Sequence, residues 1–230
     1  MIDWHSHVLP KMDDGSRSIE ESISMLDFLS EQGVSIVIAT PHFDADDESV
    51  DIFLERRAHA YQSLAPHLKP EHPRVFCGAE VKYYPGIAKM KDLSRLTMEG
   101  TNILLLEMPM AKWSDYMVKE LVELAGTRGL TIVMAHIERY IGMQKRGVVD
   151  WLCANGIWMQ VNATFFERIR TRRQAMRLLG RGVIRVIGSD CHNLTSRPPR
   201  LRTAYDLIQK RWGEDVVHQI HGVGHRALKQ

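Results

Sequence analysis

Seven short apolar runs recur along the chain, and segments with helical spacing separate them. Each run consists mainly of aliphatic and β-branched residues and is about as long as a buried strand. The runs cover residues 1–4, 34–40, 74–80, 102–107, 130–136, 156–162 and 182–189. Because strand and helix alternate, we expect right-handed βαβ units and a parallel sheet, either open or closed into a barrel.

The segments between the runs carry helix start and stop signals. Residues 18–21 and 171–174 have the spacing of capping boxes, so we expect a helix to begin at each of them. The first helix is expected to stop at Gly33 and the other near Gly180, because glycine commonly follows the last helical turn. A further helical pattern covers residues 113–129.

The length and composition of the chain fit one globular unit. At 230 residues, with 44% hydrophobic residues, the chain can bury a sizeable core, so we expect a single domain over 1–230. No apolar run approaches the roughly 20 residues of a membrane helix, which predicts a protein that is not membrane-embedded. The three cysteines (Cys77, Cys153 and Cys191) form no CxxC pair, and the N-terminus lacks a signal-peptide pattern. Both features favour the reducing cytoplasm.

In a parallel α/β fold, functional groups gather where the strands end at their carboxyl side. Six of the seven runs end in, or lead into, a histidine or a carboxylate, and Asn162 closes the remaining run. His5 and His7 stand two residues apart, a spacing at which a strand projects both side chains from one face. Each such residue taken singly is commonly structural, but their coincidence at one rim predicts a metal cluster. The candidate ligands are His5, His7, Asp13 or Asp14, His42, Glu80, Glu107, His136, Asp190 and His192.

This set of nitrogen and oxygen ligands exceeds what one ion can bind, so we expect two or three ions such as Mn²⁺, Fe²⁺ or Zn²⁺. Clusters in which carboxylates bridge the ions typically hydrolyse phosphoesters. Arg139 and Arg197 follow His136 and His192 on loops that leave the predicted rim. Because forked guanidinium donors suit phosphate oxygens, we expect these two arginines to bind the phosphate. Arg17 is a weaker candidate for the same role.

The order of the motifs resembles that of a known family. HSH, DDG, PH, GAE, LLLE, AHIERY and SDCHN follow one another as in the polymerase and histidinol phosphatase (PHP) superfamily, specifically its bacterial capsule-type protein-tyrosine phosphatases. The resemblance runs nearly end to end. It implies a distorted seven-stranded (β/α) barrel with a trinuclear, usually manganese-supported centre at the C-terminal rim. It also implies a phosphotyrosine substrate on the tail of a membrane-associated tyrosine kinase that controls capsule or exopolysaccharide assembly.

The resemblance also implies how the ligands are shared among the ions. It assigns His5, His7, Glu80 and Asp190 to one ion, Glu80, Glu107 and His136 to a second, and the DDG aspartate, His42 and His192 to a third. Arg139 and Arg197 would bind the phosphate. Asp14, next to Gly15, is preferred over Asp13 because the loop between HSH and the first acid is longer here than in the polymerase branch. Asp13 remains an alternative.

Three other interpretations of the sequence compete with this one. Cys191 and Arg197 have the C-x₅-R spacing of cysteine-dependent tyrosine phosphatases, but the segment between them contains no glycine to let its backbone curl around a phosphate. A second alternative is that the same centre acts on histidinol phosphate, another small phosphomonoester or a nucleic-acid end. A binding module with a structural metal is the third, although structural zinc sites usually close on four ligands, often cysteines.

Arginines are concentrated between residues 168 and 185, where acidic residues are few. The simplest interpretation is a solvated helix face, and the functional one is a surface that attracts a phosphorylated or acidic partner. Because this stretch lacks interleaved aromatic residues, we do not expect nucleic-acid binding. Tyr83, Tyr84, Met110 and Trp113 follow strand ends and are candidates to pack against a tyrosyl ring.

Overall fold

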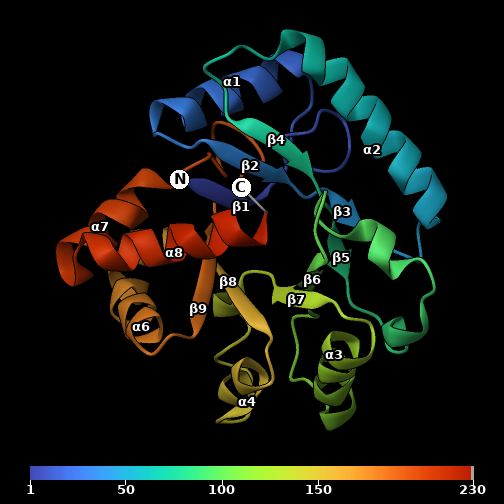
Figure 1. Cartoon of the computed structure of the whole chain (residues 1–230), viewed down its shortest axis with the longest axis vertical. Coiled ribbons are helices and arrows are strands. Elements are labelled where there is room, and N and C mark those ends of the chain that lie inside the picture. The colour runs from blue at the N-terminus through green and yellow to red at the C-terminus, as the bar shows by residue number, and fades with distance from the viewer. Residues whose placement is uncertain (229–230) are drawn as a thin grey trace.

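The computed structural model of the chain describes residues 1–228, and strands and helices alternate along it (Figure 1). The strands are β1 (Ile2–Ser6), β2 (Ile36–Ala39), β3 (His42–Phe43), β4 (Arg74–Cys77), β5 (Glu80–Lys82), β6 (Ile103–Glu107), β7 (Thr131–Met134), β8 (Trp158–Asn162) and β9 (Ile184–Gly188). The helices are α1 (Ile19–Glu31), α2 (Val50–Leu64), α3 (Asp115–Thr127), α4 (Val148–Ala154), α5 (Thr164–Glu167), α6 (Ile169–Gly180), α7 (Arg202–Trp212) and α8 (Glu214–Ala227). Short 3₁₀ turns cover Ala65–His67, Ile87–Lys89, Leu93–Leu96 and Ile137–Arg139.

The strands form two parallel sheets, and the helices lie outside them (Figure 1). The smaller sheet has the order β1-β2-β4 and the larger one the order β3-β5-β6-β7-β8-β9. Every pair of neighbouring strands is parallel. The expected α/β fold built on parallel strands is therefore confirmed.

Two chain segments run from one sheet into the other. β2 leads into β3 across Pro41, and β4 leads into β5 across Gly78. The apolar run 74–80, expected as one strand, is thus divided, because β4 pairs with β2 whereas β5 pairs with β3. A proline lacks the N–H that a continuous ladder needs, which breaks the pairing at position 41.

The other edges of the two sheets meet at β1 and β9. The backbone N–H of Asp190 donates to the carbonyl oxygen of His5 at 2.8 Å, and the N–H of His7 donates to that of Cys191 at 2.9 Å. Gly188 permits this approach, since a Cβ there would lie 2.6 Å from Cβ of His5. The first and last strands therefore bring the HSH and SDCHN motifs together.

Apolar side chains pack on both sides of the strands. One large cluster lies between the strands and the surrounding helices. A second cluster takes side chains from both sheets, from α8 and from adjoining segments: Ile2, Trp4, Ile36, Ile38, Met98, Ile103, Leu105, Val133, Ala135, Val186, Val223 and Leu228. Strands of both sheets thus contribute to one apolar cluster.

The inner face of the strands changes from apolar to polar along its length. In β6, Ile103 and Leu105 belong to the second cluster, which we call the inner apolar cluster. Glu107 follows on the same face because side chains alternate along a strand. In β8, Trp158 packs against the cluster, and Gln160 and Asn162 follow it. This alternation places polar groups at the carboxyl ends of the strands.

One of the two predicted capping boxes is confirmed. Ser18 caps α1, where its side chain accepts from the N–H of Glu21, and Ser114 caps α3 in the same way. The predicted start at residues 171–174 is wrong, because α6 begins at Ile169. Thr171 lies inside its first turn, and the Thr171 hydroxyl donates to the carbonyl oxygen of Phe165. Within residues 1–228, no helix is long and apolar enough to cross a membrane.

Candidate metal centre

The structure brings all the predicted ligand side chains into one cluster at the carboxyl ends of the strands. Their potential ligand atoms form four overlapping groups, and the atoms within each group lie within 4.8 Å of one another. The groups are His7, Asp14, His42 and His192; His5, His7 and Asp190; His5, Glu80 and His136; and His42, Glu80 and Glu107. The overlaps connect the groups into a single site.

Glu80 lies at the centre of the buried floor of this site. One carboxylate oxygen of Glu80 is 2.9 Å from Nε2 of His5 and 3.3 Å from Nε2 of His7. The other oxygen is 2.8 Å from Nε2 of His136. His192 and Asp190 complete the floor, and all of these side chains are nearly inaccessible to water. Both oxygens of the Glu80 carboxylate therefore lie among imidazole nitrogens.

Partly exposed side chains form the mouth of the site. The exposed fractions of their side chains are 65% for Asp14, 38% for His42 and 27% for Glu107. Arg139 and Arg197 are each 36% exposed. The site is therefore open to solvent on this side, where acidic, imidazole and guanidinium groups are exposed.

The two adjacent aspartates of DDG have different surroundings. Oδ2 of Asp13 lies 2.7 Å from Nδ1 of His7 and accepts the backbone N–H of His42 at 2.9 Å. Oδ1 of Asp14 lies 3.1 Å from Nε2 of His192 and 3.5 Å from Nε2 of His42. Asp13 thus lies behind His7, whereas Asp14 faces the ring nitrogens that point into the cluster. Gly15 lets the loop approach, since a Cβ there would lie 2.5 Å from Cβ of His7.

Arg139 and Arg197 both contact Asp190. The guanidinium of Arg139 donates to Oδ2 of Asp190, and that of Arg197 donates to Oδ1 at 2.8 Å. Arg197 also lies 3.6 Å from Oδ2 of Asp14. Both arginines therefore lie at the edge of the cluster, with donors directed toward it. Arg17 is exposed, and the described part of the chain shows no contact between its guanidinium and the cluster.

The carboxylates favour positive charge at the floor of the site. Burial by itself lowers the pKa of His7, but Asp13 and Glu80 outweigh burial and raise this pKa to about 10. Burial likewise disfavours ionised Glu80, yet the imidazoles of His5, His136 and His7 hold the pKa of Glu80 well below its usual range. At the mouth, burial and repulsion from Glu80 raise the pKa of Glu107 to about 7. At the floor, an ionised Glu80 therefore lies beside a His7 imidazole that favours its protonated form.

The arrangement of nitrogen and oxygen atoms in the cluster suits divalent cations better than it suits hydrogen bonds among these atoms. Nε2 of His192 is buried and makes no hydrogen bond with any described residue. Nε2 of His5 and Nε2 of His7 face each other at 3.1 Å, with a Glu80 oxygen beside both. Several atoms with lone pairs thus converge, and imidazole and carboxylate are ligands that Mn²⁺, Fe²⁺ and Zn²⁺ accept.

Two of these residues are held in an unusual backbone conformation. His136 has a φ of 33° and Asp190 a φ of 53°. Both values lie in the left-handed region of backbone conformation, which residues other than glycine rarely adopt. Such residues cost about 1–3 kcal/mol each and concentrate at functional sites. The fold thus supports this strain at two strand ends of the cluster.

A second layer of polar side chains holds the ligands. Oε1 of Gln160 accepts the backbone N–H of His136 at 2.5 Å and lies 3.4 Å from Nδ1 of His5. Nε2 of Gln160 donates to Asn162, whose own amide donates to Asp190 at 2.7 Å. Asn162 was noted at a strand end from the sequence, but Gln160 was not. The alternation of side chains in β8 would have revealed Gln160, since it shares a face with Asn162.

Tyr140 is another residue that was not predicted from the sequence. Its hydroxyl lies 3.1 Å from Nδ1 of His136, and its ring is fully buried. An interaction at Nδ1 fixes the orientation of an imidazole whose Nε2 faces the cluster. The sequence signal was the AHIERY motif itself, in which the tyrosine lies four residues after the histidine.

The surroundings of Cys191 disfavour its use as a nucleophile. The thiol is fully buried, and this burial raises its pKa far above the usual value. A thiol must ionise to attack, so a cysteine-dependent mechanism lacks its reactive group here.

The residues expected near a tyrosyl ring divide into buried and exposed ones. Trp113 is 3% exposed and Tyr83 is 5% exposed, and the hydroxyl of Tyr83 donates to Glu120. Both therefore pack within the protein. Met110 is 64% exposed and Tyr84 is partly exposed, so these two remain available to a substrate.

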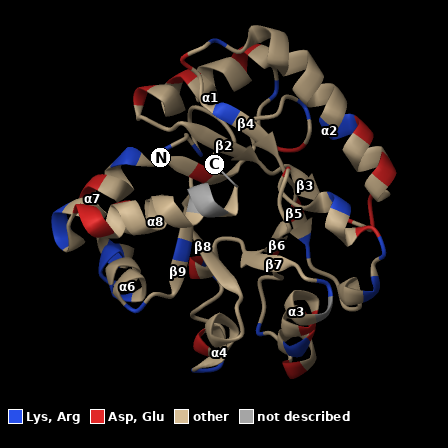
Figure 2. Cartoon of the chain, viewed as in Figure 1, with Lys and Arg blue, Asp and Glu red and all other residues tan. Residues whose placement is uncertain are grey.

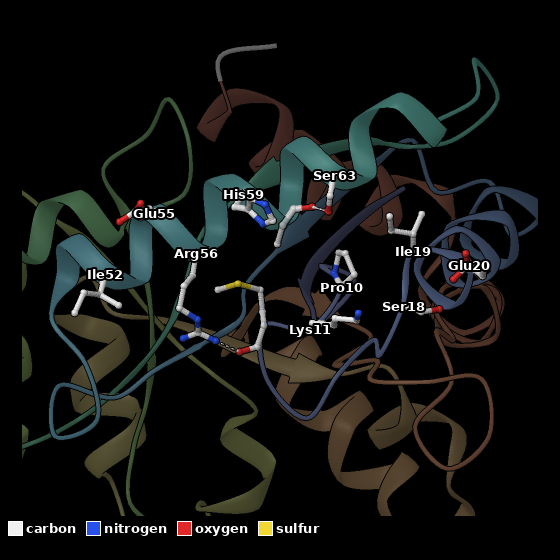
Figure 3. A pocket seen from close by; sticks show the side chains of 12 residues that line it. Pro10, Lys11, Ser18, Ile19, Glu20, Ile52, Glu55, Arg56, His59 and Ser63 are labelled. Atoms are coloured by element: carbon white, nitrogen blue, oxygen red, sulfur yellow. Dashed lines mark hydrogen bonds between the residues drawn. The ribbon is translucent and has the colours of Figure 1, made fainter.

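A separate cavity of about 650 Å³ lies between α1, α2 and the loop before DDG (Figure 3). Arg56 extends from α2 beside this cavity and donates to the carbonyl oxygen of Met12, which ties α2 to the loop (Figure 3). Glu20, Glu55, Lys11 and His59 also line the cavity. None of the clustered ligands lines it, so this cavity is distinct from the candidate metal centre.

Known proteins share both the sequence and the fold. The profile of the family described as capsular polysaccharide synthesis, CpsB/CapC, matches residues 1–226. Tyrosine-protein phosphatase CpsB of Streptococcus pneumoniae is 31% identical over 236 residues, covering 96% of this chain and 94% of that protein. Tyrosine-protein phosphatase YwqE of Bacillus subtilis is 27% identical, covering 96% of this chain and 88% of that protein.

The similarity extends to a solved structure. A crystal structure from work on YwqE of Bacillus subtilis and CpsB of Streptococcus pneumoniae, described as unique metal-dependent tyrosine phosphatases, has a TM-score of 0.86 to this chain. It is 24% identical in sequence, covers 100% of this chain and 94% of that one, and shows that the fold is shared. The family match, together with the identity to CpsB, establishes that the chain belongs to the CpsB/CapC family of capsular polysaccharide synthesis.

Proposed function

We propose that this chain is a metal-dependent protein-tyrosine phosphatase. The observation that carries the proposal is the convergence of imidazoles, carboxylates and two arginines on one partly open site. The relatives named tyrosine-protein phosphatases cover nearly the whole chain, which supports phosphotyrosine as the substrate class. The family description supports a role in capsule or exopolysaccharide synthesis.

We infer that the cations are held by the clustered side chains, with Asp14 rather than Asp13 as a ligand. The proposed ligands are His5, His7, Asp14, His42, Glu80, Glu107, His136, Asp190 and His192. Asp13 instead orients His7 from behind, since it contacts the ring nitrogen that points away from Glu80. Two or three ions fit this number of ligands, and we propose Mn²⁺ as the native metal, with Fe²⁺ or Zn²⁺ as alternatives.

The side chains at the mouth then bind and orient the substrate. Arg139 and Arg197 present guanidinium forks, which match the oxygens of a phosphate. Cations bound at such a centre neutralise phosphoryl charge and activate water, which is the chemistry that they supply. A tyrosyl leaving group has an ordinary pKa of about 10, so its departure needs less protonation than that of an alkoxide. Hydrolysis of an aryl phosphate is therefore the reaction that this site suits.

We further propose that the two sheets act as one distorted barrel that spans a single domain. The β1–β9 hydrogen bonds and the inner apolar cluster, which draws on both sheets, support this arrangement. A closed ring explains how strand ends distant in sequence meet at one rim. The proposed substrate is a phosphotyrosine protein, specifically a membrane-associated tyrosine kinase. The cysteines are all free, which fits the proposed cytoplasmic location.

The test compares substrates before and after metal removal. The purified protein is treated with a chelator, and its activity is measured on a phosphotyrosine peptide, on the matched phosphoserine peptide and on histidinol phosphate. We expect hydrolysis of the phosphotyrosine peptide only, its loss with the chelator and its recovery with Mn²⁺. Full activity after verified metal removal would contradict the metal-dependent mechanism. Preference for histidinol phosphate would contradict the proposed substrate.

A further inference from the structure

A groove lined by arginines lies between α6 and α7. Its volume is about 1030 Å³, and no Asp or Glu of the described residues lines it. Figure 2 shows basic positions along α6 and at the end of α7. The arginines that line the groove are Arg170, Arg172, Arg173, Arg177, Arg181 and Arg211. None of the proposed metal ligands lines this groove, so it is distinct from the candidate metal centre.

Four of these arginines form a stripe along one face of α6. Arg170, Arg173, Arg177 and Arg181 follow one another at spacings of three or four residues, which places neighbours on the same side of a helix. All four are exposed, and Arg181 pairs with Asp150. Among the side chains that the structure describes, the other three form no ion pair. Like charges at this spacing destabilise a helix, so an anionic partner would relieve the repulsion.

Trp212 closes the groove at the C-terminal end of α6. A Cβ at Gly180 would lie 2.6 Å from Cζ2 of Trp212, so the glycine lets the indole ring rest on the helix. The guanidinium of Arg211 lies 5.6 Å from the centre of the Trp212 ring. Trp212 is nevertheless 42% exposed, and at the other end of α6 Ile169 is 86% exposed. An exposed apolar side chain therefore stands at each end of the groove.

One end of the groove lies at the same end of the strands as the candidate metal centre. Asn162, which donates to Asp190, closes β8, and α6 starts at Ile169 after the short helix α5. From there α6 returns toward the start of β9, so its N-terminus lies at the same end of the strands as the metal centre. A helix of 12 residues is about 18 Å long, a length that five or six residues of extended chain cover.

We propose that this groove binds an acidic segment of the polypeptide that carries the phosphotyrosine, an inference that rests on the proposed function. Guanidinium forks suit carboxylates, and Arg170, Arg173 and Arg177 of the groove form no ion pair with any described side chain. A lipid surface fits less well, because the exposed apolar residues Ile169 and Trp212 lie at opposite ends of a hollow surface. Acidic side chains next to the phosphotyrosine would therefore increase the affinity of the substrate.

The test uses two phosphotyrosine peptides of equal length, one with six glutamates on each side of the phosphotyrosine and one with six serines. Arg173→Gln/Arg177→Gln removes two exposed charges from the groove. Arg74→Gln/Lys119→Gln removes two exposed charges from β4 and α3 and serves as the matched control. We expect the groove variant to lower the ratio of kcat/KM for the glutamate peptide to that for the serine peptide roughly tenfold, mostly through KM. The control variant should leave this ratio as in the wild type.

Two further measurements separate the alternatives. Anisotropy of a labelled twelve-glutamate peptide reports binding without catalysis, and added salt should weaken this binding in the wild type more than in the groove variant. Sedimentation with phosphatidylglycerol vesicles tests a lipid surface. An unchanged kcat/KM ratio, or loss of vesicle binding alone, would overturn the proposal. If neither phosphotyrosine peptide is hydrolysed, the proposed function fails, whereas the anisotropy result still tests the groove.

Discussion

Oδ2 of Asp13 lies 2.7 Å from Nδ1 of His7, and Nε2 of the same imidazole lies 3.3 Å from Glu80. Because an interaction at one ring nitrogen fixes the tautomer and orientation of the imidazole, Asp13 holds the His7 ring with Nε2 directed toward Glu80. Asp14 is the next residue, but it faces His42 and His192 directly. Neighbouring aspartates thus have different proposed roles.

Variants of the two aspartates distinguish these roles. We expect Asp14→Asn to remove a ligand, so that the content of bound metal falls by one ion and activity on a phosphotyrosine peptide is lost. Asp13→Asn should keep the full number of ions but lower metal affinity about tenfold to a hundredfold, since only an orienting partner is changed. Metal titration followed by elemental analysis measures both quantities. Asp46→Asn, on an exposed turn, is the control, and an identical effect of both DDG variants would contradict the assignment.

Replacing either arginine that we propose to bind the phosphate with lysine should separate substrate binding from metal binding. Arg139→Lys and Arg197→Lys keep the charge but lose the forked donors, so we expect kcat/KM for a phosphotyrosine peptide to fall about a hundredfold. Metal content should stay at the wild-type level, because neither guanidinium is a ligand. Arg17→Lys is the comparison, since the Arg17 side chain is exposed. A loss of metal in parallel with activity would instead show that the arginines support the fold of the site.

Removal of the Cys191 thiol should have little effect on catalysis. The thiol is buried and its pKa is raised by burial, so it remains protonated at neutral pH. We expect Cys191→Ala to keep activity on a phosphotyrosine peptide within a few fold of the wild type, and iodoacetamide to leave the wild type active. Chelation should abolish activity in both proteins. Inactivation by iodoacetamide that the alanine variant resists would revive the cysteine mechanism.

Gly188 and Gly126 offer opposite tests of packing. A Cβ at Gly188 would lie 2.6 Å from Cβ of His5 and 2.9 Å from its backbone nitrogen, so Gly188→Ala must push β9 away from β1. We expect a loss of about 1–3 kcal/mol in the free energy of unfolding, together with weaker metal binding.

Gly126 lies in α3, where a Cβ would meet no described side chain within 4 Å, so Gly126→Ala should stabilise the folded protein by about 0.5–1 kcal/mol. Urea denaturation with chelator present measures the free energy of unfolding of both glycine variants, and metal titration of Gly188→Ala measures its metal affinity.

Asp3 should make stability fall as the pH rises. Burial raises the pKa of Asp3 to about 6, although Ser189 and the N–H of His5 donate to its carboxylate. An unfolded aspartate has a pKa of about 3.9, so the folded state binds more protons and loses stability as the pH rises through 4 to 6. The total loss is on the order of 3 kcal/mol.

The Asp3→Asn variant checks this pH dependence. Asparagine stays neutral and keeps an acceptor oxygen for the two backbone N–H groups, so the variant should lack the loss of stability. The free energy of unfolding of the variant relative to the wild type should therefore rise by roughly 1.5 kcal/mol between pH 5 and 7.5. Chelator in all samples removes the contribution of bound metal. Asp92→Asn, on an exposed segment, provides the baseline, and a pH-independent difference for Asp3→Asn would contradict the assignment.

The sequence by itself determined the alternation of strand and helix and the candidate ligands. Apolar runs report strand burial directly, and residues such as His136 and Glu107 stand at the ends of these runs. Parallel βαβ units place such ends on one side of a sheet, which is why the clustering of these side chains could be predicted before any contact was known. The Ser18 cap was also predictable, because capping depends on residues only three positions apart.

Only the tertiary structure decided which groups meet and how. The division of run 74–80 between two sheets depends on its pairing partners, β2 and β3, and the start of α6 at Ile169 depends on contacts with α5. The different surroundings of Asp13 and Asp14 arise because their loop folds onto His7. Likewise, the contact between Gln160 and the His5 ring joins residues that are far apart in the chain. Such contacts are set by packing between distant segments, and spacing along one segment carries no information about them.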